Sequence, residues 1–258
     1  MAWIREAIGA LVDIDGTLVD VGRGAVPGAA AFLDRLHARA LPYKICSNTS
    51  RRSRADVVRA LADDGLRVRA GDIVLPALLA RRTILDSGAH RAQLLVPEAC
   101  VADFAGIEAV EEGGDWVVVG DLGRGFTADR LDPAFRALRD GARLLALHRN
   151  LSWYAGPERG WVLDAGAYVA ALEQASGAAA IVVGKPARAF FDLALADLGL
   201  PAADVVMIGD SIENDCVGAA AAGCRTCVVR GTAFRAETLA ASPVRPDVVV
   251  DSVDDLTP

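Results

Sequence analysis

The sequence lacks any apolar run long enough to cross a bilayer. Its 258 residues are 53% hydrophobic and 24% charged, a balance typical of a globular protein. The first residues contain Arg5 and Glu6 and lead into an apolar stretch that holds Asp13 and Asp15, which the core of a signal peptide would not tolerate. We therefore expect a soluble protein with no membrane partner.

Cysteine is scarce, with five residues spread over the chain without regular spacing. An odd number in a chain of this length does not indicate a disulfide framework, which favours a reducing, cytoplasmic location. Cys224-Arg225-Thr226-Cys227 has the spacing of a redox or zinc motif, but no second ligand pair follows it. We assign these cysteines to packing.

An excess of basic residues is also missing, because 34 acidic residues outnumber 27 basic ones and the formal net charge is -7. This balance does not favour a nucleic-acid partner. A small anionic substrate would instead need a local positive site, such as a metal ion or an isolated lysine.

Short apolar runs alternate with helical patterns along most of the chain, which predicts an α/β fold with a Rossmann-like parallel sheet and helices on both faces. The expected core strands are 8–14, 43–47, 180–183, 205–208 and 225–229, and the expected core helices are 28–39, 52–64, 187–198 and 213–222. In such sheets ligands bind at the carboxyl ends of the strands.

A second set of elements lies between about residues 75 and 177 and predicts an inserted α/β cap domain. Strands are expected at 93–96, 116–119 and 143–147, and helices at 98–104 and 127–140. The predicted division is 1–75 for the first part of the core, 76–177 for the cap and 178–258 for the second part of the core.

Asp13 and Asp15 follow the first apolar run, and Gly16 allows a sharp turn there. Carboxylates at a buried strand end need compensation by a cation or by hydrogen bonds, which favours a metal site. Asp13 could attack phosphorus while Asp15 protonates the leaving oxygen, since two similar carboxyls can take different roles in different environments. An ordinary turn of Asp and Gly is the alternative.

Polar residues also follow other predicted core strands. Ser47 and Asn48 offer hydroxyl and amide groups to a phosphate, although such residues are common in loops and helix caps. Lys185 would neutralise a phosphate, unless it is an exposed loop lysine. Asp210 stands at the end of another strand and suits magnesium, as does Asp215, which could instead be a favourable charge at a helix start.

Together these residues resemble the four motifs of the haloacid dehalogenase superfamily of phosphatases, over almost the whole chain. The resemblance implies that Asp13 is the nucleophile and a Mg²⁺ ligand, and that Asp15 is the general acid and base and lends its backbone carbonyl to the metal. Asp210 would complete the metal site. Ser47, the Asn48 backbone and Lys185 would hold the phosphoryl group, with Asp215 in a supporting role, through water or by orienting its neighbours.

The insertion between the second and third motifs resembles the branch with a type II cap, which includes NagD-like and p-nitrophenyl phosphatases. Gly184-Lys185-Pro186, Phe190-Phe191 and the segment 140–148 are similar to members related to phospholysine phosphohistidine inorganic pyrophosphate phosphatase. Dimers formed through the cap occur in this branch, so a homodimer is one expectation.

One departure concerns substrate selection, because His148-Arg149-Asn150-Leu151 stands where many members of the branch carry a Thr-Asn-x-Asp segment. The loop that follows would face the core site and select the substrate, or its aromatic residues would belong to the cap core. The candidate residues are Arg149, Trp153, Tyr154 and Trp161. We expect a structural role for His148.

The sequence therefore predicts a magnesium-dependent phosphatase that hydrolyses a small phosphorylated metabolite through an aspartyl-phosphate. A phosphomutase would use the same pair of aspartates. A dehalogenase would have no use for Asp15, and a signalling module of the receiver type would lack the large insertion. A protein that binds metal or phosphate without catalysis is the remaining alternative.

Overall fold

The computed structural model describes residues 7–155 and 158–256, and its contacts divide the chain into two compact units. The first unit comprises residues 1–47, 55–74 and 185–258, and the second comprises residues 48–54 and 75–184. Within the described ranges, the helices are too short or too polar to span a membrane.

A six-stranded parallel sheet forms the centre of the first unit, in the order β15-β14-β13-β1-β4-β5. Its strands are β1 (Gly9–Val12), β4 (Tyr43–Cys46), β5 (Ile73–Val74), β13 (Val205–Gly209), β14 (Arg225–Val229) and β15 (Val248–Val250). Every residue of β1 and β13 is buried, as expected for strands that helices cover on both faces.

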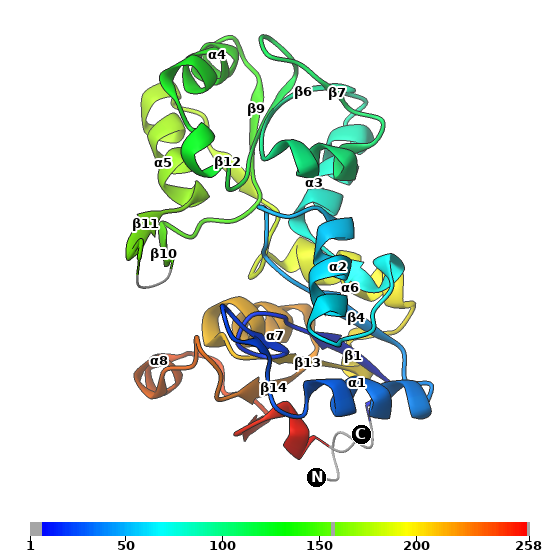
Figure 1. Ribbon diagram of the computed structural model, residues 1–258. Helices are drawn as coiled ribbons and strands as arrows, with labels where there is room; N and C mark the ends of the chain where they lie inside the picture. The colour runs from blue at the N-terminus through cyan, green and yellow to red at the C-terminus, as the bar shows by residue number, and fades with distance from the viewer. Residues whose placement is uncertain (1–6, 156–157, 257–258) are drawn as a thin grey trace. The chain divides into compact units, whose positions relative to one another are not determined.

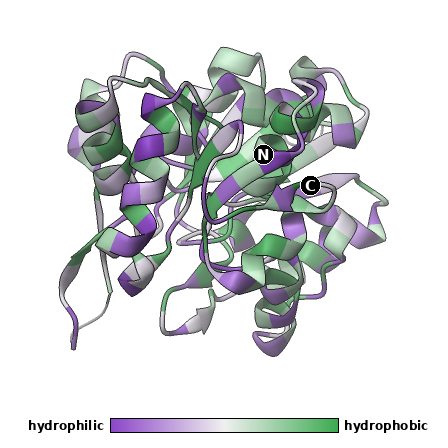
Figure 2. Cartoon of the chain, turned by 90° about the horizontal axis from the view of Figure 1, so that it is seen from above, coloured by the Kyte–Doolittle hydropathy of each residue, from purple (hydrophilic) through white to green (hydrophobic). Residues whose placement is uncertain are grey.

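Helices lie on both faces of this sheet, and Figure 1 shows α1 and α7 on opposite sides of it. The helices of the unit are α1 (Ala29–Ala38), α2 (Arg54–Asp63, whose first residue belongs to the second unit), α6 (Arg188–Leu198), α7 (Gly218–Ala222) and α8 (Ala236–Ala241). Green and purple bands alternate along the helices in Figure 2, because apolar residues at helical spacing pack inward and charged residues face solvent.

The second unit contains a five-stranded parallel sheet in the order β12-β9-β8-β6-β7. Its strands are β6 (Arg91–Leu95), β7 (Glu108–Ala109), β8 (Trp116–Val119), β9 (Arg143–Ala146) and β12 (Ala180–Val182), and its helices are α3 (Pro76–Asp86), α4 (Ala128–Arg139) and α5 (Ala165–Ser176). A predicted helix at 98–104 is a 3-10 helix.

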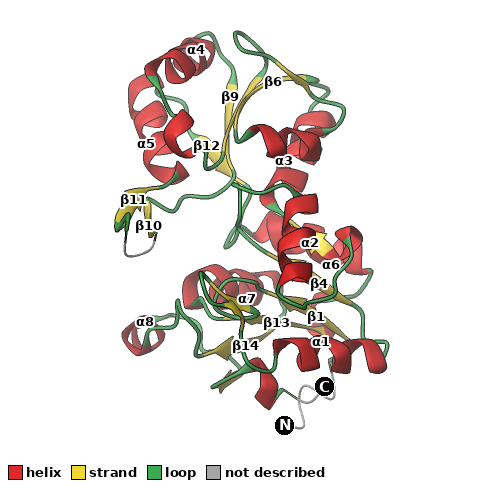
Figure 3. Cartoon of the chain, in the orientation of Figure 1, coloured by secondary structure: helices red, strands yellow, loops and turns green. Residues whose placement is uncertain are grey.

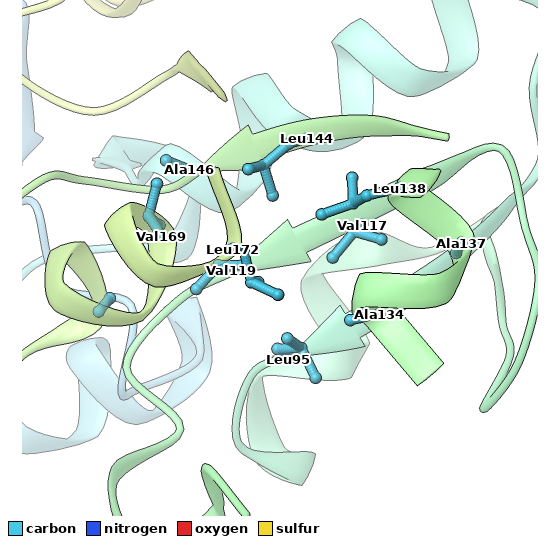
Figure 4. Close-up of a cluster of buried hydrophobic side chains, with 11 residues drawn as sticks. Leu95, Val117, Val119, Ala134, Ala137, Leu138, Leu144, Ala146, Val169 and Leu172 are labelled. Carbon is cyan, nitrogen blue, oxygen red and sulfur yellow. The ribbon is translucent and has the colours of Figure 1, made fainter. Parts of the chain in front are cut away.

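One face of this second sheet packs against α4 and α5. Val117 and Val119 lie two residues apart on β8, so their side chains share a face, and Figure 4 shows them among side chains from both helices. Ala134 and Val169 are fully buried in the same cluster. Because alternate side chains of β8 point to the same face of the sheet, they pack with α4 and α5 into a hydrophobic core within the second unit.

The α/β class and the parallel sheets flanked by helices are confirmed, but one strand was assigned to the wrong sheet. The apolar run at 180–183 was expected in the core, whereas β12 pairs with β9 of the second unit. Apolar periodicity identifies a strand and carries no information about which of two parallel sheets will accept it. Lys185, the first residue of the returning first unit, therefore follows a strand of the second sheet.

Two short antiparallel ribbons were not predicted: β2 (Val19–Asp20) with β3 (Gly24–Ala25), and β10 (Ser152–Tyr154) with β11 (Trp161–Leu163), which is drawn in yellow in Figure 3. Trp161 and Leu163 are two residues apart on β11, so they share a face of the ribbon, and both are exposed. Strands this short carry too little alternation for a sequence pattern to reveal them.

Candidate active site

Asp13 directly follows β1 and is buried, and its backbone N–H donates to the Ile208 carbonyl, which continues the pairing of β1 with β13. Burial raises the pKa of Asp13 well above its usual range, and nearby Asp215, Asp15 and Asp210 add to this, while Lys185 opposes it. The carboxyl is thus held in a cluster of like charges that a cation would stabilise.

Lys185, one of two lysines in the sequence, supplies part of the positive charge that these carboxylates need. Its Nζ donates to Asp13 Oδ1 and to Asp215 Oδ1, both at 2.6 Å, and to the Cys46 carbonyl at 3.1 Å. Burial would lower its pKa, but attraction to the two carboxylates outweighs burial and raises it. The side chain is 3% exposed, so Lys185 is a charged group in the interior and not a surface loop lysine.

Asp210 follows β13 and is 1% exposed. Its Oδ2 accepts a hydrogen bond of 2.6 Å from the backbone N–H of Ala233. Burial raises the pKa of Asp210 to about 7, although this hydrogen bond and Lys185 favour the ionised form. A cation beside Asp210 would restore ionisation at neutral pH.

Asp215 lies on the helical turn that follows, at Ile212–Val217, and is buried. Besides its contact with Lys185, its Oδ2 accepts from the backbone N–H of Ser211 at 3.1 Å. Asp215 does lie in the first turn of this helical segment, as the alternative interpretation had it, but it is buried and in contact with Lys185. Asp215 holds Lys185 beside Asp13.

Two glycines let the backbone approach these carboxylates. A Cβ at Gly16, which has φ of +79°, would lie against the Asp210 carboxylate, and a Cβ at Gly209 would lie against that of Asp215. A larger residue at either position would displace a carboxylate.

The carboxylates of Asp13, Asp210 and Asp215 could hold a metal ion. One oxygen from each lies within 4.8 Å of the others, and all three residues are buried. Three buried carboxylates face a single lysine, so the cluster carries an excess of negative charge. Oxygen donors of this kind fit a hard divalent cation such as Mg²⁺.

Asp15 differs from Asp13 in its environment. It is exposed, forms an isolated bridge with Val19, and lies near enough for its charge to raise the pKa of both Asp13 and Asp210. Exposure gives Asp15 access to solvent protons, which an acid and base requires.

Ser47 follows β4 and is buried, with its backbone N–H donating to the Val74 carbonyl at 3.3 Å. Asn48 comes next in the chain but belongs to the second unit. Both residues take part in further interactions. The structure thus brings Asp13, Lys185, Asp210 and Asp215 together by direct contact or short distance, with Asp15 close by.

The residues predicted to select the substrate all lie in the second unit. Arg149 pairs with Glu173, Trp153 has the Arg51 guanidinium 4.8 Å from its ring centroid, and Trp161 is 73% exposed. The side chain of Tyr154 lies outside the described part of the structure. Trp161 therefore does not belong to a buried core of its unit.

His148 is buried in the same unit, as expected for a structural residue. Its Nε2 lies 2.9 Å from Ser50 Oγ and 3.7 Å from Asp164 Oδ1, and the Ser50 hydroxyl also accepts from the Asp121 backbone N–H at 2.8 Å. Burial lowers the pKa of His148, against the attraction of Asp164 and Asp121. Since Ser50 and Asp164 meet the same nitrogen, this is not the relay of a catalytic triad.

One contributor was missed by the reasoning from sequence, namely the backbone N–H of Ala233. It lies in the loop after β14, whose apolar residues were recognised as a strand. The carboxyl ends of parallel strands meet at one edge of the sheet, so the loop after β14 could have been expected near the site. The donor itself could not, because it is a backbone N–H and does not depend on the residue type.

Two family models match the chain. One, described as haloacid dehalogenase-like hydrolase, covers residues 10–108, and a second model of HAD-like hydrolases covers residues 182–256. Between them they include Asp13, Asp15, Ser47, Lys185 and Asp210.

Curated and solved relatives extend the similarity over the whole chain. The bovine (Bos taurus) phospholysine phosphohistidine inorganic pyrophosphate phosphatase is 35% identical over 95% of this chain and 91% of its own length. The 4-nitrophenylphosphatase of Thermotoga maritima has a TM-score of 0.90 at 27% identity, covering 98% of this chain and 97% of that one. The glycerol phosphate phosphatase of Mycobacterium tuberculosis, solved in complex with calcium, has a TM-score of 0.87 at 29% identity, covering 97% and 75%.

Proposed function

Because this chain belongs to the haloacid dehalogenase-like hydrolase family, we propose that it is a Mg²⁺-dependent phosphatase in which Asp13 forms an aspartyl-phosphate. The single observation that carries the proposal is the buried group of Asp13, Lys185, Asp210 and Asp215, in which Asp13 and Asp210 directly follow β1 and β13. The substrate class is a small phosphorylated metabolite.

The first step assigns attack on phosphorus to a carboxylate oxygen of Asp13. An O–P bond forms to Asp13 while the bond from phosphorus to the leaving oxygen breaks, and Asp15 donates its proton to that oxygen. The burial of Asp13 and the exposure of Asp15 support this division, since the nucleophile must be desolvated and the acid must exchange protons.

In the second step, Asp15 takes a proton from water, which attacks phosphorus and breaks the bond to Asp13. Phosphate is released and Asp13 is regenerated as a carboxylate. Ser47, the Asn48 backbone and Lys185 would hold the phosphoryl group in both steps, and Lys185 would offset part of its negative charge.

Asp13 and Asp210 would ligate the cation, with the backbone carbonyl of Asp15, and Asp215 would support them by holding Lys185. When bound, Mg²⁺ would offset the charge that develops on the phosphoryl oxygens. The calcium complex of the mycobacterial relative supports a divalent cation in a protein of this kind.

The test is phosphate release from a broad panel of phosphorylated metabolites, including pyrophosphate, with Mg²⁺ or with a chelator. We expect Mg²⁺-dependent turnover that is lost in Asp13→Asn and Asp15→Asn. Asp34→Asn, which changes an exposed aspartate of the same unit, is the matched control and should keep wild-type activity.

The other outcomes identify the rival functions. Transfer of phosphate to a sugar instead of water would show a phosphomutase, halide release would show a dehalogenase, and a stable phosphoprotein without turnover would show a signalling module. Full activity of Asp13→Asn would overturn the assignment of the nucleophile.

Substrate selection by Arg149, Trp153, Tyr154 and Trp161 stays a prediction, supported by the exposure of Trp161. It is tested by Trp161→Ala in the same panel, which should change the order of KM among substrates while kcat for the best one changes little. An unchanged order of KM would contradict it. The homodimer also stays a prediction.

A further inference from the structure

The loop after β14 contacts the candidate site at three successive residues, Gly231, Thr232 and Ala233, here called the 231–233 segment. All three belong to the first unit, as do the residues that they meet. The four motifs of the sequence analysis do not include this segment. Gly231 and Ala233 meet Asp210, and Thr232 meets Asp20.

Ala233 fixes the orientation of Asp210. Its backbone N–H donates to Asp210 Oδ2 at 2.6 Å, a short bond to a carboxylate that is 1% exposed. Because a carboxylate is planar, fixing one oxygen limits the rotation that would move the other. The backbone donor therefore sets the direction in which Asp210 presents its remaining lone pairs.

Gly231 allows the segment to approach both Asp210 and the turn after β1. A Cβ at this position would lie 2.8 Å from Asp210 Cβ and 2.8 Å from Asp210 Oδ2, and would overlap the Gly16 carbonyl. Gly231 is not among the glycines with positive φ, so an alanine would meet no backbone strain there. Glycine is required at position 231 because Asp210 and the Gly16 carbonyl lie so close, and not because of its backbone conformation.

Thr232 connects the segment to the short ribbon that follows the turn. Its Oγ1 donates to Asp20 Oδ1 of β2 at 3.0 Å, and its backbone N lies 2.9 Å from the place of a Cβ on Gly16. The hydroxyl bond is exposed and adds little energy by itself. It places the segment between Asp210 and the chain that carries Asp13 and Asp15.

We propose that the 231–233 segment is a positioning element that sets the affinity of the site for its divalent cation, by holding the Asp210 carboxylate against the turn that carries Asp13. This inference rests on the proposed function only in taking Asp210 as a metal ligand. Its residues act through Asp210 and through the Gly16 backbone, and need no contact with substrate.

The experiment measures Mn²⁺ binding to the full chain by electron paramagnetic resonance, with no substrate present. Gly231→Ala should bind Mn²⁺ roughly 10- to 100-fold more weakly than the wild type, the range seen when groups that orient metal ligands are removed. Gly71→Ala is the matched control, because Gly71 has ordinary φ and open space around its Cβ position, and its affinity should stay within about twofold.

Folding is checked by circular dichroism of each variant. Should Gly231→Ala fail to fold, Ala233→Pro removes the donor to Asp210 at an exposed position and should weaken Mn²⁺ binding in the same direction. In a turnover assay, both variants should raise the Mg²⁺ concentration needed for half activity more than they lower kcat at saturating Mg²⁺.

The outcomes separate the two proposals. If the wild type binds Mn²⁺ and the folded variants bind it with the same affinity, the positioning role alone is overturned. A wild-type protein that binds no Mn²⁺ would overturn the metal dependence and this inference with it.

Discussion

Two aspartates separated by one residue occupy different environments in the candidate site. Asp13 is buried beside Lys185, while Asp15 is exposed and close enough to influence the pKa of Asp13. A buried carboxylate keeps its charge only where a cation or donor faces it, and Lys185 meets both Asp13 and Asp215. At the scale of the residue, Lys185 thus provides the positive charge that allows the buried carboxylates of Asp13 and Asp215 to lie close together without metal.

Lys185→Met should destabilise the metal-free protein by about 3–5 kcal/mol, because it leaves two buried carboxylates without their shared cation. Urea unfolding in the presence of a chelator measures this change. Adding Asp215→Asn to Lys185→Met should recover part of the loss, since one of the two uncompensated charges is then removed.

Lys44→Met is the control, because Lys44 carries the same charge at a partly exposed position, where it donates to the Gly71 carbonyl and lies 4.0 Å from the exposed carboxylate of Asp197. Its effect should stay below about 1 kcal/mol. Equal effects of the two lysine substitutions would contradict the account of the buried charge group.

His148 gives the second unit a pH-dependent stability. Burial holds the pKa of His148 below its usual value, so the unfolded chain binds the proton first as pH falls below about 6.5. The contribution of His148 to the free energy of unfolding is therefore fully present above that pH and decreases toward pH 5. His148→Gln should flatten this loss, measured as the melting temperature between pH 8 and pH 5.

The exposed His90, changed to Gln, is the control for that series and should retain the wild-type pH dependence. Burial raises the pKa of Asp164 and the nearby His148 lowers it, so the two groups titrate as a pair and the change in His148→Gln reports on that pair. An equally steep acid loss in His148→Gln would show that another group is responsible.

At the scale of the element, the site is built from strand ends, and this is what the sequence could predict. Asp13, Ser47 and Asp210 directly follow apolar runs that became β1, β4 and β13. The position of Lys185 was anticipated although its strand belongs to the other sheet, because the residue type and the apolar run are visible while pairing partners are not. The donor from Ala233 stayed hidden because any residue except proline has that N–H.

Packing of α6 against α7 supports the turn that carries Lys185. A Cβ on Gly218, the first residue of α7, would lie 2.8 Å from the Pro186 carbonyl oxygen and against the Phe191 ring. Gly218→Ala should therefore destabilise the protein by about 1–3 kcal/mol despite the higher helix propensity of alanine.

Urea unfolding of Gly218→Ala measures that change, with Gly71→Ala as a glycine that has open space around it. A Gly218→Ala protein as stable as the wild type would mean that α6 and α7 can separate at little cost.

At the scale of the whole molecule, the sequence predicted the α/β class, the parallel core sheet and the family. The match to relatives along the chain, at 35% identity to the bovine phosphatase, agrees with this. Helices α3 and α5 and the ribbon of β10 and β11 were not anticipated, and all of them lie in the second unit. The two strands of the ribbon have three residues each, which is too short for an alternating pattern to identify them.

Cation binding should stabilise the fold as a whole, because the ligands come together only in the folded chain. At a Mg²⁺ concentration about 100 times Kd the gain is about 2.7 kcal/mol, visible as a higher melting temperature than with a chelator. Asp210→Asn should lose this increase while Asp34→Asn keeps it. An equal increase in Asp210→Asn would place the cation elsewhere.

The central claim is that Asp13 becomes phosphorylated, and mass spectrometry of the trapped enzyme tests it most directly. Asp15→Asn is mixed with p-nitrophenyl phosphate, whose leaving group departs without a proton, so that the first step proceeds and hydrolysis of the intermediate is slowed. The account predicts one phosphoryl group on the peptide that contains Asp13, and none when Asp13→Asn is added. A phosphoryl group on another residue, or turnover of the Asp13→Asn enzyme, would contradict it.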